Sequence, residues 1–235
     1  MVTERGIPLA TATALCAAIA ATVGWPAKAN LLAVQAIGIC EEAADKSDVT
    51  VALGNLGFRA PVSGDADAVF DLTVKVGYHL TSGISTPPED FADAQATSVE
   101  MYEDAKTNLS SLLRFPLTST DFGDPLVSSD KDVWVEIYAQ EDTRADGELV
   151  ECQITATPCD ALTAIAQDVP RMIEPDVSIY DPAWVDDRFA PDRAETGGVM
   201  SAAILNPEMF ERHYGDPLAA TLRLYVRNRP AGTDN

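Results

Sequence analysis

AVFDLTVKVGYHL, residues 68–80, opens the stretch that decides the expected fold. Its apolar side chains recur at every second position from Phe70 to Tyr78, which places them on one face of a pleated strand. The other face carries Asp71 and Lys75 and is expected to meet water or a partner. His79 lies at the end of this polar face, where we expect a surface or interface histidine and not a general base.

The next segment predicts a long amphipathic helix over residues 88–113. Thr86-Pro87-Pro88-Glu89 has the spacing of a helix start, in which the threonine accepts from free amides and the glutamate reaches back to it. Beyond it, apolar residues from Phe91 to Leu113 recur three and four positions apart, and Pro116 ends the pattern. We expect this helix to pack across the sheet.

Two later stretches predict a β-hairpin. Apolar and polar side chains alternate over residues 133–138 and again over 150–155. Asp146-Gly147 supplies turn chemistry between them. One sheet with a helix across it is the simplest way to bury these apolar faces.

The N-terminal part allows two interpretations. Residues 7–24 are rich in alanine and almost uncharged, and Ala27-Lys28-Ala29 resembles a cleavage site, so residues 1–29 have the outline of a signal peptide. The alternative, which we favour, is a core helix ended by Pro26. A second helix is expected from Asn30 to near Asp45, followed by a short strand over 48–54.

The C-terminal part predicts less regular structure. We expect a short helix over 161–172, a Pro- and Asp-rich arm over 174–198, a short helix over 200–210 and a closing strand over 222–227. The predicted fold is therefore α+β, with a mostly antiparallel sheet, helices packed on one face and an irregular C-terminal extension. The expected domains are a core over residues 1–157 and an extension over 158–235.

The charge of the chain excludes several partners. With 37 acidic and 16 basic residues the net charge is −21, which repels the phosphates of nucleic acid and anionic membranes. This bias suggests a halophilic or marine source, where salt screens a dense surface charge. A merely acidic cytosolic protein is the alternative.

No pattern in the sequence indicates catalysis. Nucleophile elbows, phosphate-binding glycine loops and metal-ligating histidine pairs are all missing, so we expect no enzyme, no cofactor and no bound metal. Cys16 and Cys40 are expected in the core. Cys152 and Cys159 are too far apart for a zinc knuckle, and a disulfide between them stays open. A further alternative is a metal-dependent enzyme in which carboxylates of the Asp-rich arm bind a divalent cation.

The residues expected to act are those that suit an interface. Aromatic side chains on polar strand faces, an arginine stripe on the last strand and the acidic arm suit contacts between proteins. The arginine stripe is alternatively explained by a sheet edge that blocks unwanted pairing. The candidate interface residues are Trp134, Tyr138, Arg223, Tyr225, Arg227, Asp186, Asp187 and Asp192.

The order and lengths of these elements resemble the tail terminator, or tail-completion, proteins of long-tailed viruses of bacteria and archaea. The matching stretches are Val69–Leu80, Pro88–Leu113 and Asp132–Thr157. The resemblance implies a structural virion protein, assembled in the host cytoplasm as a ring, usually hexameric, that binds copies of itself and neighbouring tail or neck proteins. The rival class is a secreted or periplasmic binding protein whose residues 1–29 are a signal peptide.

Overall fold

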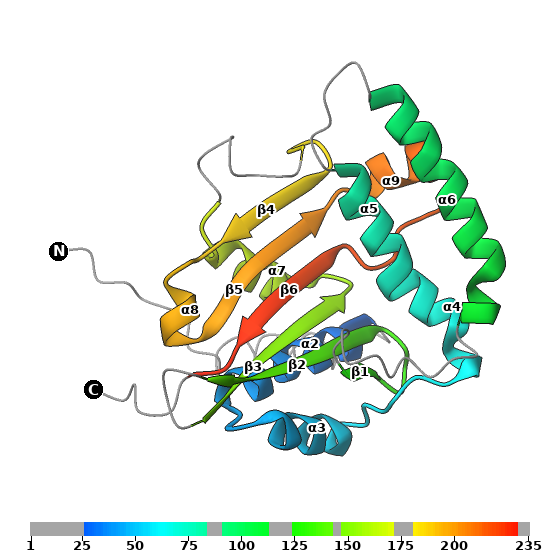
Figure 1. Cartoon of the computed structure of the whole chain (residues 1–235). Coiled ribbons are helices and arrows are strands. Elements are labelled where there is room, and N and C mark those ends of the chain that lie inside the picture. The colour runs from blue at the N-terminus through cyan, green and yellow to red at the C-terminus, as the bar shows by residue number, and fades with distance from the viewer. Residues whose placement is uncertain (1–25, 84–90, 113–123, 143–146, 172–180, 230–235) are drawn as a thin grey trace.

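The computed structural model describes residues 26–83, 91–112, 124–142, 147–171 and 181–229. At its centre lies one antiparallel sheet with the strand order β1-β2-β3-β6-β5-β4 (Figure 1). The strands are β1 (Asp124–Val127), β2 (Val133–Asp142), β3 (Gly147–Ala156), β4 (Val185–Phe189), β5 (Gly198–Leu205) and β6 (Leu222–Arg227). The α+β class and the antiparallel sheet are thus confirmed.

Helices cover both faces of this sheet. The first core lies under α2 (Pro26–Glu42), α3 (Lys46–Asn55) and α7 (Asp160–Asp168). The second core lies on the opposite face, under α4 (Ala66–Val69), η2 (Phe70–Val74), α5 (Lys75–Gly83), α6 (Phe91–Leu112) and α9 (Pro207–Tyr214). The expectation of helices on one face is therefore wrong. At one end of the second face the strands carry apolar side chains, which must be buried under helices just as those of the first face are. They include Trp134, Val185, Ala203 and Leu205.

Residues 66–83 are helical throughout, so the strand predicted over 68–80 is wrong. The same sequence contains a helical spacing, since Val69, Leu72, Val76 and Leu80 recur three and four apart and are all buried. A five-residue π-helical stretch at its centre shifts the phase of the helix and brings Phe70 into the same core. Burial against the sheet thus overrides the strand preference of the β-branched residues.

Residues 46–55 form α3, where a strand over 48–54 was expected. Asp45 caps this helix by accepting from the amide of Asp48 at 2.9 Å. Val49 and Leu53, one helical turn apart, are buried, whereas Val51 is 61% exposed. The preceding helix α2 is as expected but begins at Pro26, a favourable first position, so Asn30 lies inside it. The predicted core helix over 7–24 lies outside the described residues.

The chain beyond Pro158 joins the same sheet and is not an irregular extension. The expected arm contains β4 and the short helix α8 (Arg193–Thr196), and the helix expected over 200–210 divides into β5 and α9. Asn206 caps α9 by accepting from the amides of Glu208 and Met209. Because β6 pairs with β3, hydrogen bonds of one sheet cross the expected boundary between residues 157 and 158.

Other predicted elements are confirmed. The hairpin of β2 and β3, the helix α6 and the strand β6 lie where the sequence places them. Leu222, Leu224 and Val226 face the first core, as predicted. On α6, Tyr102 is fully buried, but Met101, which was assigned to the same apolar stripe, is 56% exposed. The predicted cap at residues 86–89 lies outside the described residues.

A disulfide joins Cys40 on α2 to Cys152 on β3, which are 112 positions apart along the chain. Both sulfur atoms lie inside the first core. The pairing of Cys152 with Cys159 that the sequence left open is therefore wrong, whereas Cys40 lies in the core as expected and forms half of the disulfide. Cys16 lies outside the described residues. The bond fastens the longest helix of the first face directly to the centre of the sheet.

Asp65 anchors the connection between α3 and α4. It is 2% exposed and accepts from both Nη atoms of Arg59, at 2.6 and 2.9 Å, and from the amide of Val62 at 2.8 Å. Lys131, in the turn between β1 and β2, lies 3.0 Å from the same carboxylate. Hydrogen bonds from Arg59, and with smaller effect those from Val62 and Lys131, hold the pKa of Asp65 far below its usual range.

We expect Asp65→Asn to lower the free energy of unfolding by about 2–3 kcal/mol, because two cations and an amide lose a buried charged acceptor. Urea unfolding at neutral pH measures this loss. Asp67→Asn, which changes an exposed carboxylate on the next turn, serves as the control and should stay within about 0.5 kcal/mol of the unmodified chain. Equal stability of the two variants would contradict the anchoring role.

Because the folded pKa of Asp65 is depressed, its contribution is present above the unfolded pKa of 3.8 and disappears as the pH falls toward the folded value. The difference between Asp65→Asn and the unmodified chain should therefore shrink below about pH 4. A difference that stays constant into strong acid would show that the variant acts through packing and not through charge.

Candidate interaction surface on the sheet

The second face of the sheet is polar over the half that the described helices leave uncovered. In Figure 1, α4, α5 and α6 lie in front of the right-hand side of the sheet, and no described helix lies in front of the left halves of β3, β6 and β5. Strand register places side chains from five strands there. We call this surface the polar sheet face, and it carries Glu136, Tyr138, Glu151, Gln153, Phe189, Ser201, Tyr225 and Arg227.

Glu136 on β2 organises one end of this face. Its carboxylate accepts from the indole Nε1 of Trp134 at 2.8 Å, from the hydroxyl of Tyr138 at 2.6 Å and from Gln153 Nε2 at 3.2 Å. Three donors on one carboxylate fix the rotamers of the side chains around it. The polar sheet face is therefore preorganised at this end before any partner arrives.

Arg227 on β6 is neutralised within the chain. Its Nε donates to Glu151 on the neighbouring strand β3 at 2.9 Å, its Nη2 donates to the same carboxylate, and its Nη1 donates to the carbonyl of Ala194 at 2.9 Å. Of the arginines on β6 that the sequence predicts as a contact surface, Arg227 is therefore paired with a carboxylate of its own chain. β6 also lies between β3 and β5, which excludes the explanation that the stripe protects a sheet edge.

Arg223 differs from Arg227, although both point to the same side of β6. Among the described residues no carboxylate lies within ion-pair distance of Arg223, and its Nε is buried without a hydrogen-bond partner. Thr155, which is directly opposite on β3, is fully buried, and its hydroxyl also has no partner. Two adjacent polar groups therefore remain unsatisfied where the polar sheet face meets the covered half.

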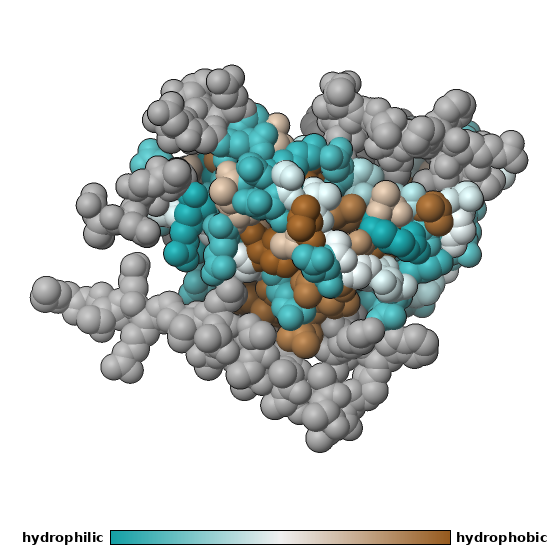
Figure 2. All heavy atoms as spheres, turned by 90° about the horizontal axis from the view of Figure 1, so that it is seen from below, coloured by the Kyte–Doolittle hydropathy of each residue, from teal (hydrophilic) through white to brown (hydrophobic). Residues whose placement is uncertain are grey.

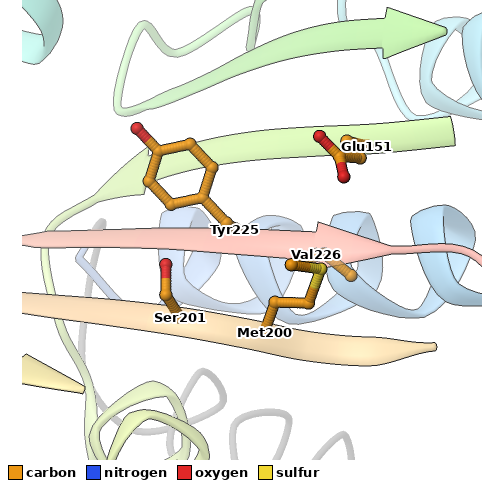
Figure 3. A pocket seen from close by; sticks show the side chains of 5 residues that line it. All are labelled: Glu151, Met200, Ser201, Tyr225 and Val226. Carbon is orange, nitrogen blue, oxygen red and sulfur yellow. The ribbon is translucent and has the colours of Figure 1, made fainter. Parts of the chain in front are cut away.

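A shallow pocket of about 190 Å³ lies on this face between β5 and β6. A β-bulge between Val199 and Ser201 adds Met200 to its wall, beside Tyr225 and Glu151 (Figure 3). Tyr225 and Phe189 are each 38% exposed and lie on either side of Ser201 in the register. Exposed aromatic rings beside a small apolar hollow are typical of the centre of a protein interface.

The acidic residues of the expected arm do not converge. Asp186 faces the first core side of β4, where it pairs with Arg171 and Arg188, whereas Asp187 points to the second face. Burial raises the pKa of Asp187. Asp181 instead accepts from the amide of Ala183 at 2.8 Å. Within the described ranges, no group of three or more His, Cys, Asp or Glu side chains is arranged to hold a metal.

The eight predicted interface residues are only partly brought together. Tyr138, Tyr225 and Arg227 lie on the polar sheet face, and Arg223 and Asp187 lie in the next row toward the helices. Trp134 shares that row but is buried in the second core. Asp186 points to the other side of the sheet, and Asp192 is exposed before α8. The sequence missed Phe189 and Met200, which it assigned to an arm and a helix.

His79 is fully buried, and the surface position expected for it is wrong because residues 75–83 are helical. Its Nε2 donates to the carbonyl of Trp184 at 3.0 Å, and its Nδ1 is buried without a partner. His213 on α9 contacts the other side of Trp184, with ring centroids 5.5 Å apart, and its Nε2 is also buried and unpaired. Burial lowers the pKa of both histidines.

The surface formed around α3 shows fewer features of a binding site than the polar sheet face does. Seen from below, polar residues surround a smaller group of apolar ones (Figure 2). Exposed apolar side chains of the described chain also include Val51 and Val62. Single exposed apolar residues are normal on a soluble surface. None of the described helices has the length and apolar content needed to cross a membrane.

Comparison with protein family models, with curated proteins and with solved structures yields no match to this chain.

Proposed function

We propose that this chain is a structural subunit that acts through protein–protein contacts, and that the polar sheet face is its contact surface. The observation that carries the proposal is the row of Glu136, Gln153, Tyr225, Ser201 and Phe189 across five strands. It combines a preorganised polar end with two exposed aromatic rings on a rigid sheet. Rigid aromatic anchors with hydrogen-bonded surroundings are what interface centres use.

The assembly that we propose is a homo-oligomeric ring, hexameric in the form that the resemblance to tail terminators implies, at the tail or neck of a tailed virus. Two of the three stretches that carry the resemblance, Pro88–Leu113 and Asp132–Thr157, contain the expected helix and hairpin. The third, Val69–Leu80, is helical, so the proposal rests on the other two and on the contact surface. We propose no catalytic role.

A test of the contact surface replaces both exposed aromatic side chains. We expect Tyr225→Ala with Phe189→Ala to weaken self-association at least about tenfold, because each ring supplies buried area at the interface centre. Met101→Ala, which truncates an apolar residue on α6 that is more exposed than either ring, serves as the control. Concentration-dependent mass measurements give the affinity. Equal affinities of the double variant and the control would contradict the proposal.

A second candidate function is a secreted or periplasmic binding protein, with residues 1–29 as a signal peptide. The observation that favours it is the disulfide between Cys40 and Cys152, because such bonds persist mainly in oxidising compartments. The polar sheet face would then bind a different protein. The intact mass of the protein from its native source separates the two candidates, since cleavage near residue 29 is expected only for the exported form.

A further inference from the structure

Trp184 joins two helices of the second core to the start of β4, where α5 and α9 lie beside it (Figure 1). Its carbonyl accepts from Nε2 of His79 on α5 at 3.0 Å and from the amide of Asn206, the N-cap of α9, at 2.8 Å. Its indole ring contacts two imidazole rings, with centroids 5.3 Å from His79 and 5.5 Å from His213 on α9. We call these four residues the tryptophan junction.

The tryptophan junction has no acceptor for an additional proton. Nε2 of His79 already donates to Trp184, so a second proton would lie on Nδ1, which is buried and has no partner within the described chain. Nε2 of His213 is buried in the same condition. A charged imidazole donates from both nitrogens, and a buried charge without acceptors costs several kcal/mol in free energy. The closed junction therefore requires neutral histidines.

Charged groups on the surrounding elements do not offset a proton there. On α5, Lys75 pairs with Asp71 at 2.7 Å, and after α9 Asp216 pairs with Lys106 at 2.8 Å. Asp187 on β4 is half-buried, and its pKa is raised by burial, so its own protonation favours the closed form and acts against the histidines. The other charged side chains of α9 and of the turn before Trp184 are exposed: Asp181, Glu208, Glu211 and Arg212.

The first core is held together independently of the tryptophan junction. It lies on the opposite face of the sheet, where the disulfide between Cys40 and Cys152 joins α2 to β3. β4 is the last strand of the sheet, so its strand partner is β5 alone. Proteins open locally where a peripheral element depends on few contacts, while the rest of the fold stays intact. The junction can therefore open without unfolding the first core.

We propose that the tryptophan junction is an acid-operated switch: when His79 and His213 take up protons, Trp184 separates from α5 and α9, and this helical cover opens while the first core stays folded. The inference does not depend on the proposed function, because it concerns the covered part of the second face and not the polar sheet face. It differs from global acid unfolding in that one face opens and the other does not.

The direction of the pH dependence follows from the burial of the two histidines. Burial lowers the pKa of both below 6.5 in the closed form, whereas the open form returns them to water. Below pH 6.5 the open form therefore binds protons that the closed form does not. Each pH unit favours the open form by up to about tenfold for each histidine, until the pKa of the closed form is reached.

Hydrogen exchange of the oxidised, unmodified chain at about pH 7.5 and about pH 5.5 tests the switch, with rates corrected for the intrinsic pH dependence of exchange. We expect amides of α5 and α9 to lose protection at least about tenfold at the lower pH, since two histidines together supply up to about a hundredfold. Amides of α2 and β3 should keep their protection. Return to the higher pH should restore the protection of α5 and α9.

Three variants assign the response to the histidines. His213→Gln, at a half-buried position, should reduce the loss of protection to that of one histidine, and His79→Gln with His213→Gln should abolish it. Phe210→Leu is the matched control, because it trims a buried ring whose centroid lies 5.5 Å from that of His79 and changes no titratable group. It should weaken the protection of α9 by the same factor at both pH values and keep the response to acid.

Several results would overturn the switch. Protection of α5 and α9 that does not change with pH shows that the junction stays closed in acid. Equal losses in α2 and β3 show global unfolding and not a local opening. A double variant that responds to acid as the unmodified chain does excludes the two histidines. If the double variant does not fold, His213→Gln alone decides, since an undiminished response in that variant contradicts the assignment.

Discussion

Replacing Cys40 and Cys152 together by serine should lower the free energy of unfolding by about 4 kcal/mol. The disulfide closes a loop whose ends are 112 positions apart in the sequence, and a cross-link of that length removes much of the entropy of the unfolded chain. The two serine hydroxyls would also lie in the first core, among apolar side chains of α2, β3 and β6. This is the largest single effect that we expect from the fold.

Urea unfolding of the oxidised chain, the reduced chain and the double serine variant measures the effect. The reduced chain and the variant should unfold at similar urea concentrations, well below that of the oxidised chain. Cys159→Ser is the control, because Cys159 lies outside the disulfide. If reduction leaves the unfolding midpoint unchanged, the bond does not fasten α2 to the sheet as we describe.

Acid should destabilise the protein through His79 and His213. The unfolded pKa of each histidine is 6.5, and burial lowers the folded pKa of both. Below pH 6.5 the unfolded chain therefore binds protons that the folded chain does not. Stability falls by up to about 1.4 kcal/mol per pH unit for each histidine until its folded pKa is reached.

The physical cause is visible at His79. Its Nε2 already donates to the carbonyl of Trp184, so a second proton would sit on the buried Nδ1, which has no acceptor. Both histidines flank Trp184, which links α5 and α9 to the start of β4. Protonation is therefore expected to loosen the second core before the first.

Unfolding free energies between about pH 8 and pH 5 test this expectation. The variant in which both histidines are replaced by glutamine should be less stable at neutral pH but should lose the steep decline. Burial raises the pKa of Glu41, Asp132 and Asp187, and these groups act in the opposite direction, so the informative quantity is the difference in slope between variant and unmodified chain. Identical slopes would contradict the assignment to the histidines.

The sequence predicts those elements whose two faces differ strongly. Apolar and polar side chains alternate clearly along β2, β3 and β6. The predictions for the hairpin and for the last strand are therefore correct. Residues 68–80 contain the periods of both a strand and a helix, and the choice is made by packing against the sheet. Residues 200–205 are mostly small or apolar and show neither period clearly, so β5 was missed.

The candidate site was predictable residue by residue but not as a surface. Alternation alone places Tyr138, Tyr225 and Arg227 on polar strand faces. Their proximity depends on the pairing of β3 with β6, a contact between strands far apart in the chain that no local pattern encodes. The same holds for the disulfide, since Cys152 has one candidate partner close in sequence and another that only the fold brings near.

The mass of the oxidised, unmodified chain in solution tests the central proposal most directly. If the polar sheet face is a self-assembly surface, native mass measurements over increasing protein concentration should show a discrete closed species at a whole-number multiple of 25.1 kDa, with six copies for the ring that the resemblance implies. A single species of 25.1 kDa at every concentration and salt level would contradict it.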